Sequence, residues 1–480
     1  MTNIRSNHLS YSSAQFRRLS DDQCQKLYWA CLEILERTGV RLYDQQALDL
    51  LAKAGVSATD GNRVRIPAGL VEKARTTVPK RVTLCDRHGK RVMLVEGHRS
   101  FFGPGSDCLN IVDHRTGERR KPVLQDVADA MVVADALPHI DFVMSMFLPV
   151  DVPQEVADRY QMDVMLNHTT KPIVFVTSDF PGCVDAVEMA KAVVGGPEAL
   201  RQNPMVACYV NVTTGLRHNE EALQKLLYLA GKGLPFMYVP STQGGVTAPV
   251  TPAGALAVSQ AGALVGLVLS QLKREGAPFI MPGWGGNMLD MRTTIQPYAD
   301  PDKRAMAADF VHFLGLPMFA LAGCSDAKAV DQQASIEAAL TLMTDALCGG
   351  NIVHDLGYLE SGLSGSLAQL VICDEILGWL EHFVRGVEIT DETLALDLID
   401  EVGPDGQFLD SEHTLKHFRE RWYPSLFERD NYNNWQTKGG KTLGERAAER
   451  VDAILAEHEP EPLPADVAKA VHDIVERAET

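Results

Sequence analysis

Eight short apolar runs divide the central part of the chain, between about residues 99 and 357, and helical periodicity follows most of them. The runs are Arg99–Gly103, Ile140–Phe147, Pro172–Thr177, Met205–Asn211, Pro235–Pro240, Phe279–Gly283, Pro317–Ala322 and Asn351–Leu356. Continuous apolar runs without strict alternation are typical of strands that are buried on both faces. Eight such strands alternating with helices predict an α/β fold, a closed parallel (β/α)8 TIM barrel.

The regions on either side predict additions to this barrel. Residues 20–54 have the spacing of two helices, and two hairpins are expected, at residues 82–95 and 109–122. The second hairpin follows the first barrel strand, so we expect it at the barrel mouth. The sequence therefore predicts three parts: N-terminal helices and a hairpin (1–97), the barrel (98–390), and a C-terminal helical extension (391–480) that packs on the barrel or on a neighbouring subunit.

Charge and composition exclude several classes of protein. The formal net charge is −18, which argues against binding to nucleic acid or to anionic membranes and is compatible with a cationic substrate. No stretch is long and apolar enough to span a membrane, and residues 1–13 are polar, so we expect a cytoplasmic protein. The nine cysteines are scattered and form no CxxC pair, which predicts reduced, mostly buried thiols and no metal site.

Parallel barrels carry their chemistry at the carboxyl ends of the strands, and aromatic residues recur there. They are Phe102, Phe147, Tyr209, Tyr238, Trp284 and Tyr358. Asn211 shares a strand face with Tyr209 by two-residue alternation. Aromatic faces attract quaternary ammonium groups, although such rings also fill barrel cores. Trp284 is the best candidate for a binding role, because it stands among Gly283, Gly285 and Gly286 in a turn.

Three ionisable residues at the end of the eighth strand are candidate catalytic groups. His354 could act as a base, a hydrogen-bond donor or a metal ligand, or it could be a structural histidine. Asp355 and Glu360 could orient His354 or bind backbone amides. His312 falls within a helix, where we expect a structural role.

Four separate motifs resemble the trimethylamine methyltransferase family, in the same order along nearly the whole chain. Residues 244–254 (GGVTAPVTPAG) resemble the family signature GATAPVTLAG. Residues 323–328 (GCSDAK), followed by 331–334 and Glu337, form the second motif, and 357–362 with 369–371 resemble the GxLExG…QLV run. The tail residues 413–418 and 422–424 resemble HTLxHF…WYP.

The resemblance implies a (β/α)8 barrel that demethylates a methylated amine. It implies that the acceptor is the Co(I) form of a corrinoid carried by a separate small protein. Founding members of the family carry pyrrolysine, whereas this chain contains only the twenty standard residues. Members without pyrrolysine are similar to demethylases of quaternary amines such as glycine betaine, proline betaine or carnitine.

A quaternary nitrogen has no proton, so a methyl group can be displaced from it without a general acid. We expect Phe102, Tyr209, Tyr238 and Trp284 to form an aromatic cage, with Phe147 and Tyr358 also binding substrate. His354, Asn211 or backbone amides near Gly286 could then hold a substrate carboxylate.

The expected partners are a cognate corrinoid protein and a small quaternary amine, with no nucleic acid and no membrane. We expect a homo-oligomer, with no cofactor and no metal bound to this chain alone. The alternatives are a methyltransferase for a tertiary methylamine or a sulfonium donor, a non-catalytic binder of quaternary amines, and a scaffold for the corrinoid protein.

Overall fold

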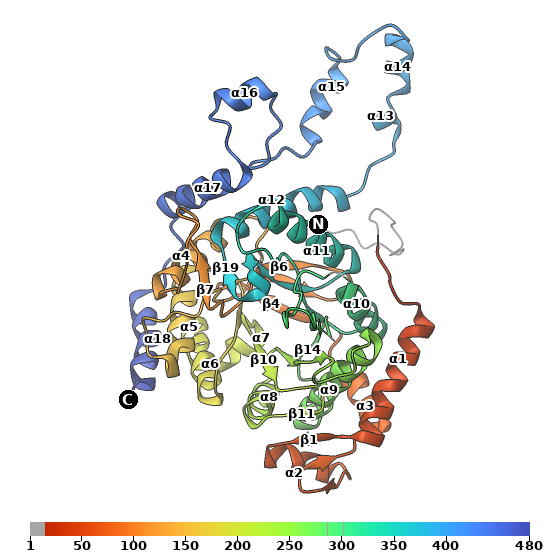
Figure 1. Ribbon diagram of the computed structural model, residues 1–480, viewed down its shortest axis with the longest axis vertical. Helices are drawn as coiled ribbons and strands as arrows, with labels where there is room; N and C mark the ends of the chain where they lie inside the picture. Colours follow the sequence, from red (N-terminus) through yellow and green to blue (C-terminus); the bar gives the residue numbers. More distant parts are fainter. Residues whose placement is uncertain (1–14, 286, 301) are drawn as a thin grey trace.

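A curled, all-parallel sheet forms the centre of the computed structural model, which describes residues 15–285, 287–300 and 302–480 (Figure 1). The strand order is β6-β17-β16-β14-β12-β10-β9. The strands are β6 (Phe101–Pro104), β9 (Ile173–Phe175), β10 (Val206–Val212), β12 (Phe236–Pro240), β14 (Phe279–Pro282), β16 (Met318–Leu321) and β17 (Ile352–Leu356). Seven of the eight apolar runs therefore form the predicted strands.

The eighth position, between β6 and β9, is occupied by residues 141–143. The amide of Asp141 donates to the Phe102 carbonyl at 2.7 Å, and the amide of Val143 donates to the Pro172 carbonyl at 2.9 Å. These bonds complete a TIM-barrel-like fold, as predicted. The prediction of a regular strand over Ile140–Phe147 was wrong. The Asp141 side chain, not a backbone carbonyl, accepts the hydrogen bond of the Phe102 amide at 2.8 Å. The chain then turns at Met146, which has a φ of 59°.

Helices cover the outside of the barrel (Figure 1). They are α4 (Leu124–Ala136), α5 (Ala157–His168), α6 (Phe180–Val194), α7 (Pro197–Gln202), α8 (Glu220–Lys232), α9 (Pro252–Lys273), α10 (Asp302–Leu314), α11 (Gln332–Cys348) and α12 (Leu367–Val384). In the described part of the chain, only α9 is long and apolar enough to cross a membrane, and 89% of its apolar window lies buried inside the protein. It is a core helix, which begins with Pro252 at its first turn and packs against β12, α1, α3 and α8.

Two apolar cores lie on the two sides of the sheet. The larger one fills the space between the sheet and the helices. The smaller one lies inside the barrel, where the predicted hairpin β4 (Val82–Cys85) and β5 (Arg91–Val95) adds Leu84 and Met93. This hairpin lies at the amino ends of the strands, because Cys85 bonds to the Pro204 carbonyl just before β10. It therefore closes the end of the barrel opposite to the mouth, which we call the base.

The N-terminal region contains the two predicted helices and a third. Its elements are α1 (Asp21–Glu33), the π-helical turn η1 (Ile34–Thr38), β1 (Val40–Leu42), α2 (Gln45–Lys53), β2 (Ala58–Thr59), β3 (Arg63–Val64) and α3 (Ala68–Thr77). The second predicted hairpin is present as β7 (Asn110–Val112) and β8 (Arg119–Arg120), and it pairs with β19 (Ser364–Gly365), which pairs with β18 (Tyr358–Leu359). The remaining short elements are η2 (Gln154–Val156), β11 (Arg217–His218), β13 (Gln243–Gly244), β15 (Asn287–Met288) and η3 (Glu360–Gly362).

The C-terminal extension is helical, and its parts differ in how they contact the barrel. Helices α17 (Leu443–Glu457) and α18 (Ala465–Ala478) pack against α12, α4, α5 and α6. The preceding elements are α13 (Asp391–Leu394), α14 (Leu396–Val402), α15 (Glu412–His417), η4 (Phe418–Glu420) and α16 (Tyr432–Thr437). They project away from the body (Figure 1). The domain boundaries at residues 97 and 390 stay a prediction.

Candidate functional site

Four rings from four strands meet at the carboxyl end of the barrel. Tyr209 lies on β10, Trp284 follows β14, Phe319 lies on β16 and His354 lies on β17. Phe319 stacks on His354 with 4.0 Å between the ring centroids, and Trp284 lies 5.3 Å from His354. Tyr209 stands edge-on to Phe319 at 5.0 Å. We call these four residues the aromatic cluster.

Strand alternation and small neighbours place these rings. On β10, Ala207 and Tyr209 face the barrel interior, and Asn211 continues the same face to an exposed position at the mouth. Trp284 stands between two glycines that have close neighbours. A Cβ on Gly283 would lie 2.4 Å from Met318, and one on Gly285 would lie 2.9 Å from Ser259 of α9. Tyr209 and Trp284 stay partly exposed, so the aromatic cluster has a face that is open to solvent.

His354 is a buried and oriented histidine. Its Nδ1 lies 2.6 Å from the Ala320 carbonyl, which assigns the proton of the neutral ring to Nδ1. Its Nε2 lies 3.4 Å from Oδ1 of Asp355. Burial lowers the pKa of His354, and the Asp355 charge opposes that effect only in part. The imidazole is therefore neutral near pH 7 and behaves as a polar, aromatic wall.

Asp355 adopts an unusual backbone conformation at the wall of the barrel. Its φ is 78°, and the pairing of β17 with β6 is irregular between Val353 and Leu356. The side chain is 2% exposed, and Tyr298 donates its hydroxyl to Oδ2 at 2.7 Å. A Cβ on Gly105 would lie 2.2 Å from Oδ1, so only glycine fits beside this carboxylate. Such strain in a buried non-glycine residue is characteristic of functional sites.

A second carboxylate, Asp107, lies beyond the end of β6 and also has a positive φ, 64°. It accepts hydrogen bonds from Gln161 at 3.0 Å and from Ser145 at 3.4 Å. Burial raises the pKa of Asp107 despite these bonds. Burial also raises the pKa of Tyr209, and the charges of Asp355 and Asp107 raise it further, which places both carboxylates near the aromatic cluster.

The structure brings five of the predicted site residues together. Tyr209, Trp284 and His354 form most of the aromatic cluster, Asp355 adjoins it, and Asn211 lies beyond Tyr209 on the same strand face. Tyr358 lies beside them, buried, with its hydroxyl bonded to the Ser106 carbonyl. The predicted Gly286 lies outside the described residues.

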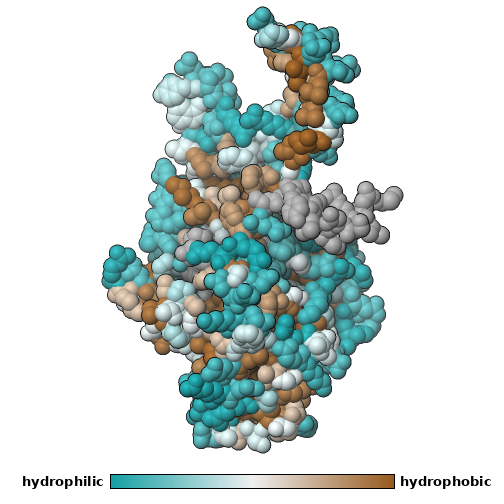
Figure 2. Space-filling model, turned by 90° about the vertical axis from the view of Figure 1, so that its right-hand side faces the viewer, coloured by the Kyte–Doolittle hydropathy of each residue, from teal (hydrophilic) through white to brown (hydrophobic). Residues whose placement is uncertain are grey.

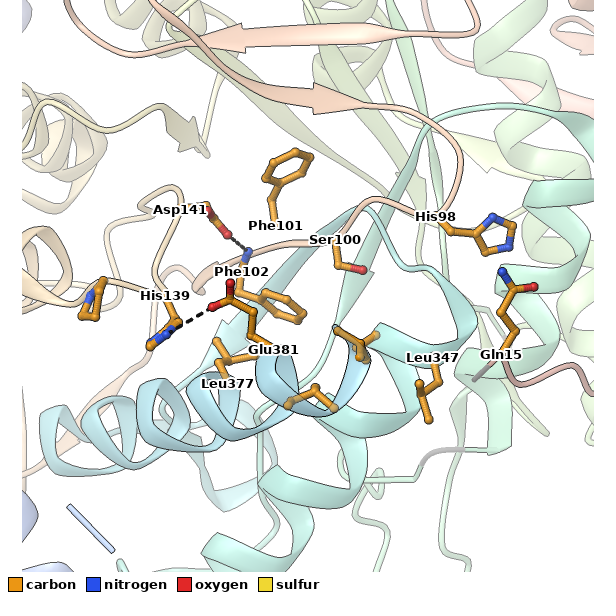
Figure 3. A pocket seen from close by; sticks show the side chains of 14 residues that line it. Gln15, His98, Ser100, Phe101, Phe102, His139, Asp141, Leu347, Leu377 and Glu381 are labelled. Atoms are coloured by element: carbon orange, nitrogen blue, oxygen red, sulfur yellow. Dashed lines mark hydrogen bonds and ion pairs between the residues drawn. The ribbon is translucent and has the colours of Figure 1, made fainter. Parts of the chain in front are cut away.

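Four other predicted residues lie away from the aromatic cluster. Tyr238 faces the helices, where its hydroxyl lies 2.8 Å from Nδ1 of the buried His218. Phe102 faces outwards beside a pocket at the base (Figure 3), and Phe147 is buried against Gly365. Glu360 forms an ion pair with Arg119 at 2.7 Å. His312 is structural, as expected: its Nε2 lies 3.0 Å from the Cys348 carbonyl in the outer shell of the barrel.

Three residues of the site were not predicted from the sequence. Phe319 lies in the middle of a predicted strand, and its inward direction could have been found by counting alternation from the strand end. Asp107 belongs to the glycine-rich segment after the first strand, which gave no sign of a buried carboxylate. Tyr298 lies in the long connection after β15, which carries no periodic signal.

Metal-binding chemistry has no visible support in the described ranges. Residues 15–285, 287–300 and 302–480 contain no group of three or more His, Cys, Asp or Glu side chains placed to hold a metal ion. All nine cysteines are free and buried, which confirms the prediction of buried thiols.

Comparison with known proteins gives matches over nearly the whole chain. The model of the family "Trimethylamine methyltransferase (MTTB)" matches residues 2–480. Trimethylamine methyltransferase MttB of Desulfitobacterium hafniense (strain DSM 10664 / DCB-2) is 32% identical over 464 residues, which are 96% of this chain and 93% of that protein. Glycine betaine methyltransferase of Desulfitobacterium hafniense (strain Y51) is 29% identical, over 94% of this chain and 95% of that protein.

A solved structure supports the fold. The monomethylamine methyltransferase MtmB of Methanosarcina barkeri superposes with a TM-score of 0.50 at 12% identity, over 97% of this chain and 89% of that chain.

Proposed function

The chain belongs to the trimethylamine methyltransferase (MTTB) family and is a methyltransferase, and we propose that it demethylates a quaternary amine of the betaine type. The methyl group would pass to the Co(I) form of a corrinoid carried by a cognate protein. The observation that carries the proposal is the aromatic cluster, in which Phe319 and His354 are buried and stack on each other while Tyr209 and Trp284 lie beside them, partly exposed.

The aromatic cluster suits a permanently charged nitrogen. Aromatic faces attract a quaternary ammonium by about 0.5–2 kcal/mol per ring, without needing a proton on the nitrogen. The neutral His354 adds a flat wall without a competing positive charge. The positive charge on nitrogen is lost as the carbon–nitrogen bond breaks. A direct ion pair would therefore stabilise the substrate more than the transition state and slow the step, whereas the weaker electrostatic attraction of the rings slows it less.

The two carboxylates are held by other side chains. Asp355 is bound by Tyr298 at 2.7 Å, and Asp107 is bound by Gln161 at 3.0 Å. In this arrangement the carboxyl oxygens already have partners within the protein, and the rings are left to make the direct contact with the cation. Their fixed positions also orient the walls of the site, and alignment of the reacting methyl group supplies much of the rate in such a displacement.

The site is open where the acceptor would have to approach. A corrinoid, when bound, supplies the nucleophile that accepts the methyl cation. Asn211 is exposed and both Tyr209 and Trp284 are partly exposed, so a methyl group held by the rings is accessible from the mouth. The residues present therefore fit a cofactor that is presented by another protein.

The test supplies the protein with a panel of methylated amines and a Co(I) corrinoid, either free or carried by a protein. Methylation of the cobalt is monitored by the change in absorbance of the corrinoid. We expect turnover with one or more quaternary amines and none with their demethylated products. Turnover only with tertiary amines or sulfonium compounds would contradict the proposal and favour the alternative donors. Binding of a quaternary amine without any cobalt methylation would contradict the proposal that the protein demethylates this amine.

A further inference from the structure

Tyr298 is held at three points, and only one of them is the carboxylate of the site. Its hydroxyl donates to Oδ2 of Asp355 at 2.7 Å. Its amide donates to Oδ1 of Asp326 at 2.8 Å, and its carbonyl accepts a hydrogen bond from the guanidinium of Arg304 at 2.5 Å. Tyr298 lies in the connection between β15 and α10, outside the helices and strands. These three contacts, rather than a regular element, therefore set the position of its side chain.

Asp326 joins this connection to the turn that follows β17. Its Oδ1 accepts both the Tyr298 amide and the hydroxyl of Ser361, which lies 2.7 Å away. Its Oδ2 lies 3.4 Å from the Ala299 amide. Ser361 has a φ of 57°, in the left-handed region. A serine keeps this conformation only where the surrounding structure fixes it, so the contact with Asp326 is built into the fold.

The backbone of Asp326 is fixed in turn by Glu337 of α11. One carboxylate oxygen of Glu337 accepts the Asp326 amide at 2.8 Å and the hydroxyl of Ser325 at 2.6 Å. Ser325, Asp326 and Glu337 belong to the second of the four sequence motifs, and Ser361 belongs to the third. The second and third motifs therefore come together around Asp326 and hold its carboxylate in place.

The carbonyl of Tyr298 is held by a buried charge. Arg304 is 1% exposed, and it also donates to the Leu321 carbonyl at 2.6 Å. Leu321 ends β16, the strand that carries Phe319 of the aromatic cluster. A buried guanidinium is costly unless its donors are satisfied, so these carbonyl contacts are integral to the fold. We call Asp326 and Arg304 the clamp, because they fix both sides of the Tyr298 backbone.

We propose that Asp326 is a positioning residue of the site, which acts through Tyr298 to keep Asp355 from pairing directly with the substrate cation. This step rests on the proposed function. Oδ1 of Asp355 lies 3.4 Å from Nε2 of His354, so this carboxylate adjoins the aromatic cluster. The Tyr298 hydroxyl donates to its other oxygen. A hydrogen bond of this kind stabilises the charged carboxylate where it is, so that it gains less by moving onto a cation.

The hydrogen bond matters because the substrate nitrogen loses its charge in the reaction. A free carboxylate beside a quaternary ammonium would stabilise the substrate more than the transition state. Loss of the Tyr298 hydroxyl should therefore make the protein bind its substrate more tightly and demethylate it more slowly. The signature is a fall in both KM and kcat, which a general loss of structure would not produce.

The first test is kinetic, with the best quaternary amine and a Co(I) corrinoid. Tyr298→Phe removes the hydroxyl and keeps the ring, and Asp326→Ala removes the acceptor of the Tyr298 amide. We expect each change to lower KM by roughly threefold and kcat by about tenfold. The double variant should lose no more than Tyr298→Phe does, because the two residues act in one network. Asp326→Asn keeps an oxygen that can accept the Tyr298 amide, so it should recover most of the wild-type kcat.

Asp331→Ala is the matched control. Asp331 also belongs to the second motif, but it is exposed, and its carboxylate caps α11 by accepting the Ala334 amide at 3.1 Å. Its loss should weaken the start of that helix and leave KM and kcat unchanged. Tyr298→Phe changes a single hydroxyl, so the kinetic test stands even where Asp326→Ala fails to fold.

The second test measures the clamp without any substrate. Hydrogen–deuterium exchange reports on the amides of Tyr298 and Ala299, which point to Asp326. Asp326→Ala should speed their exchange by about tenfold, and Asp326→Asn should keep the Tyr298 amide slow.

Three outcomes would each overturn the proposal: unchanged exchange in Asp326→Ala, a raised KM in Tyr298→Phe, or additive losses of kcat in the double variant. A wild type that demethylates no quaternary amine would contradict the proposed function and, with it, the role of Asp326. Faster exchange in Asp326→Ala would then identify the clamp as purely structural.

Discussion

Backbone strain gathers around the aromatic cluster. Asp107, Met146 and Asp355 all have φ between 59° and 78°, a conformation that costs about 1–3 kcal/mol for a non-glycine residue. They come from three different segments at the mouth, and Asp107 and Asp355 hold the two carboxylates of the site. Such strain persists because the surrounding barrel fixes the backbone more strongly than local preference does.

Replacing Asp355 with glycine should separate stability from function. Glycine adopts a positive φ without cost, so we expect Asp355→Gly to raise the free energy of unfolding by about 1 kcal/mol or to leave it unchanged. Methyl transfer should fall at least tenfold, because Tyr298 beside the aromatic cluster loses the carboxylate that accepts its hydroxyl. Urea unfolding and turnover on the same sample measure both quantities. A destabilised Asp355→Gly with full activity would contradict this account.

Trp284 should contribute directly to binding of the cation. Trp284→Ala removes one ring from the aromatic cluster, and a loss of about 0.5–2 kcal/mol corresponds to roughly a two- to thirtyfold weaker substrate affinity. Trp284→Phe should recover most of it. The KM for the best quaternary amine is the measurement, and Trp29→Ala is the control, because Trp29 is exposed on α1 far from the mouth. An unchanged KM in Trp284→Ala would remove the ring from the site.

At the scale of single elements, the pairing of neighbouring strands explains which aromatic residues reach the site. In parallel strands, paired residues point to the same side of the sheet. Tyr209 pairs with Met237, which lies in the inner core, whereas Tyr238 pairs with Val210 in the outer core. Nearness to a strand end in the sequence predicts where a residue lies along the barrel axis, but not whether it points to the inside or the outside. That is why Tyr238 and Phe102 were expected in the cage and lie outside it.

The hairpin β4–β5 should be essential for the stability of the barrel. Met93 is fully buried in the inner core, at the closed end of the barrel. Met93→Ala leaves a cavity there, and buried Met to Ala changes cost about 2–5 kcal/mol. Denaturant unfolding should show this loss, whereas Val92→Ala on the exposed face of the same strand should cost less than about 0.5 kcal/mol. A loss below about 1 kcal/mol for Met93→Ala would show that the hairpin is not an integral part of the core.

At the scale of the whole molecule, the fold was predictable because the hydrophobic pattern sets it. Seven strands and the helices between them follow from continuous apolar runs and helical spacing. Residues 140–147 have the same pattern, but there the Asp141 side chain accepts the hydrogen bond of the Phe102 amide that a backbone carbonyl would accept in a regular strand pair. The path of residues 385–421 was not predictable, because in the described part of the chain their helices contain no buried residue that would fix their direction (Figure 2).

Two buried carboxyl groups should make the stability of the whole protein fall with rising pH. Burial raises the pKa of Asp141 to about 6, and burial raises that of Asp345 to about 7, although Arg304 opposes the second shift. The native state therefore holds more protons than the unfolded state between about pH 4, the ordinary aspartate value, and pH 7. By linkage, the free energy of unfolding decreases as pH rises through this window.

The test compares variants with the wild type, because other groups titrate in the same range. Burial lowers the pKa of His218 to about 3 and that of His312 to about 4, and these histidines make stability rise with pH instead. The double variant Asp141→Asn, Asp345→Asn keeps both side-chain shapes and removes only the carboxyl contribution. We expect its advantage over the wild type in urea unfolding to grow from pH 5 to pH 8, by a kcal/mol or more in order of magnitude. The exposed substitution Asp22→Asn should show no such growth, and a constant difference between the double variant and the wild type would mean that both carboxyls keep ordinary pKa values in the folded protein.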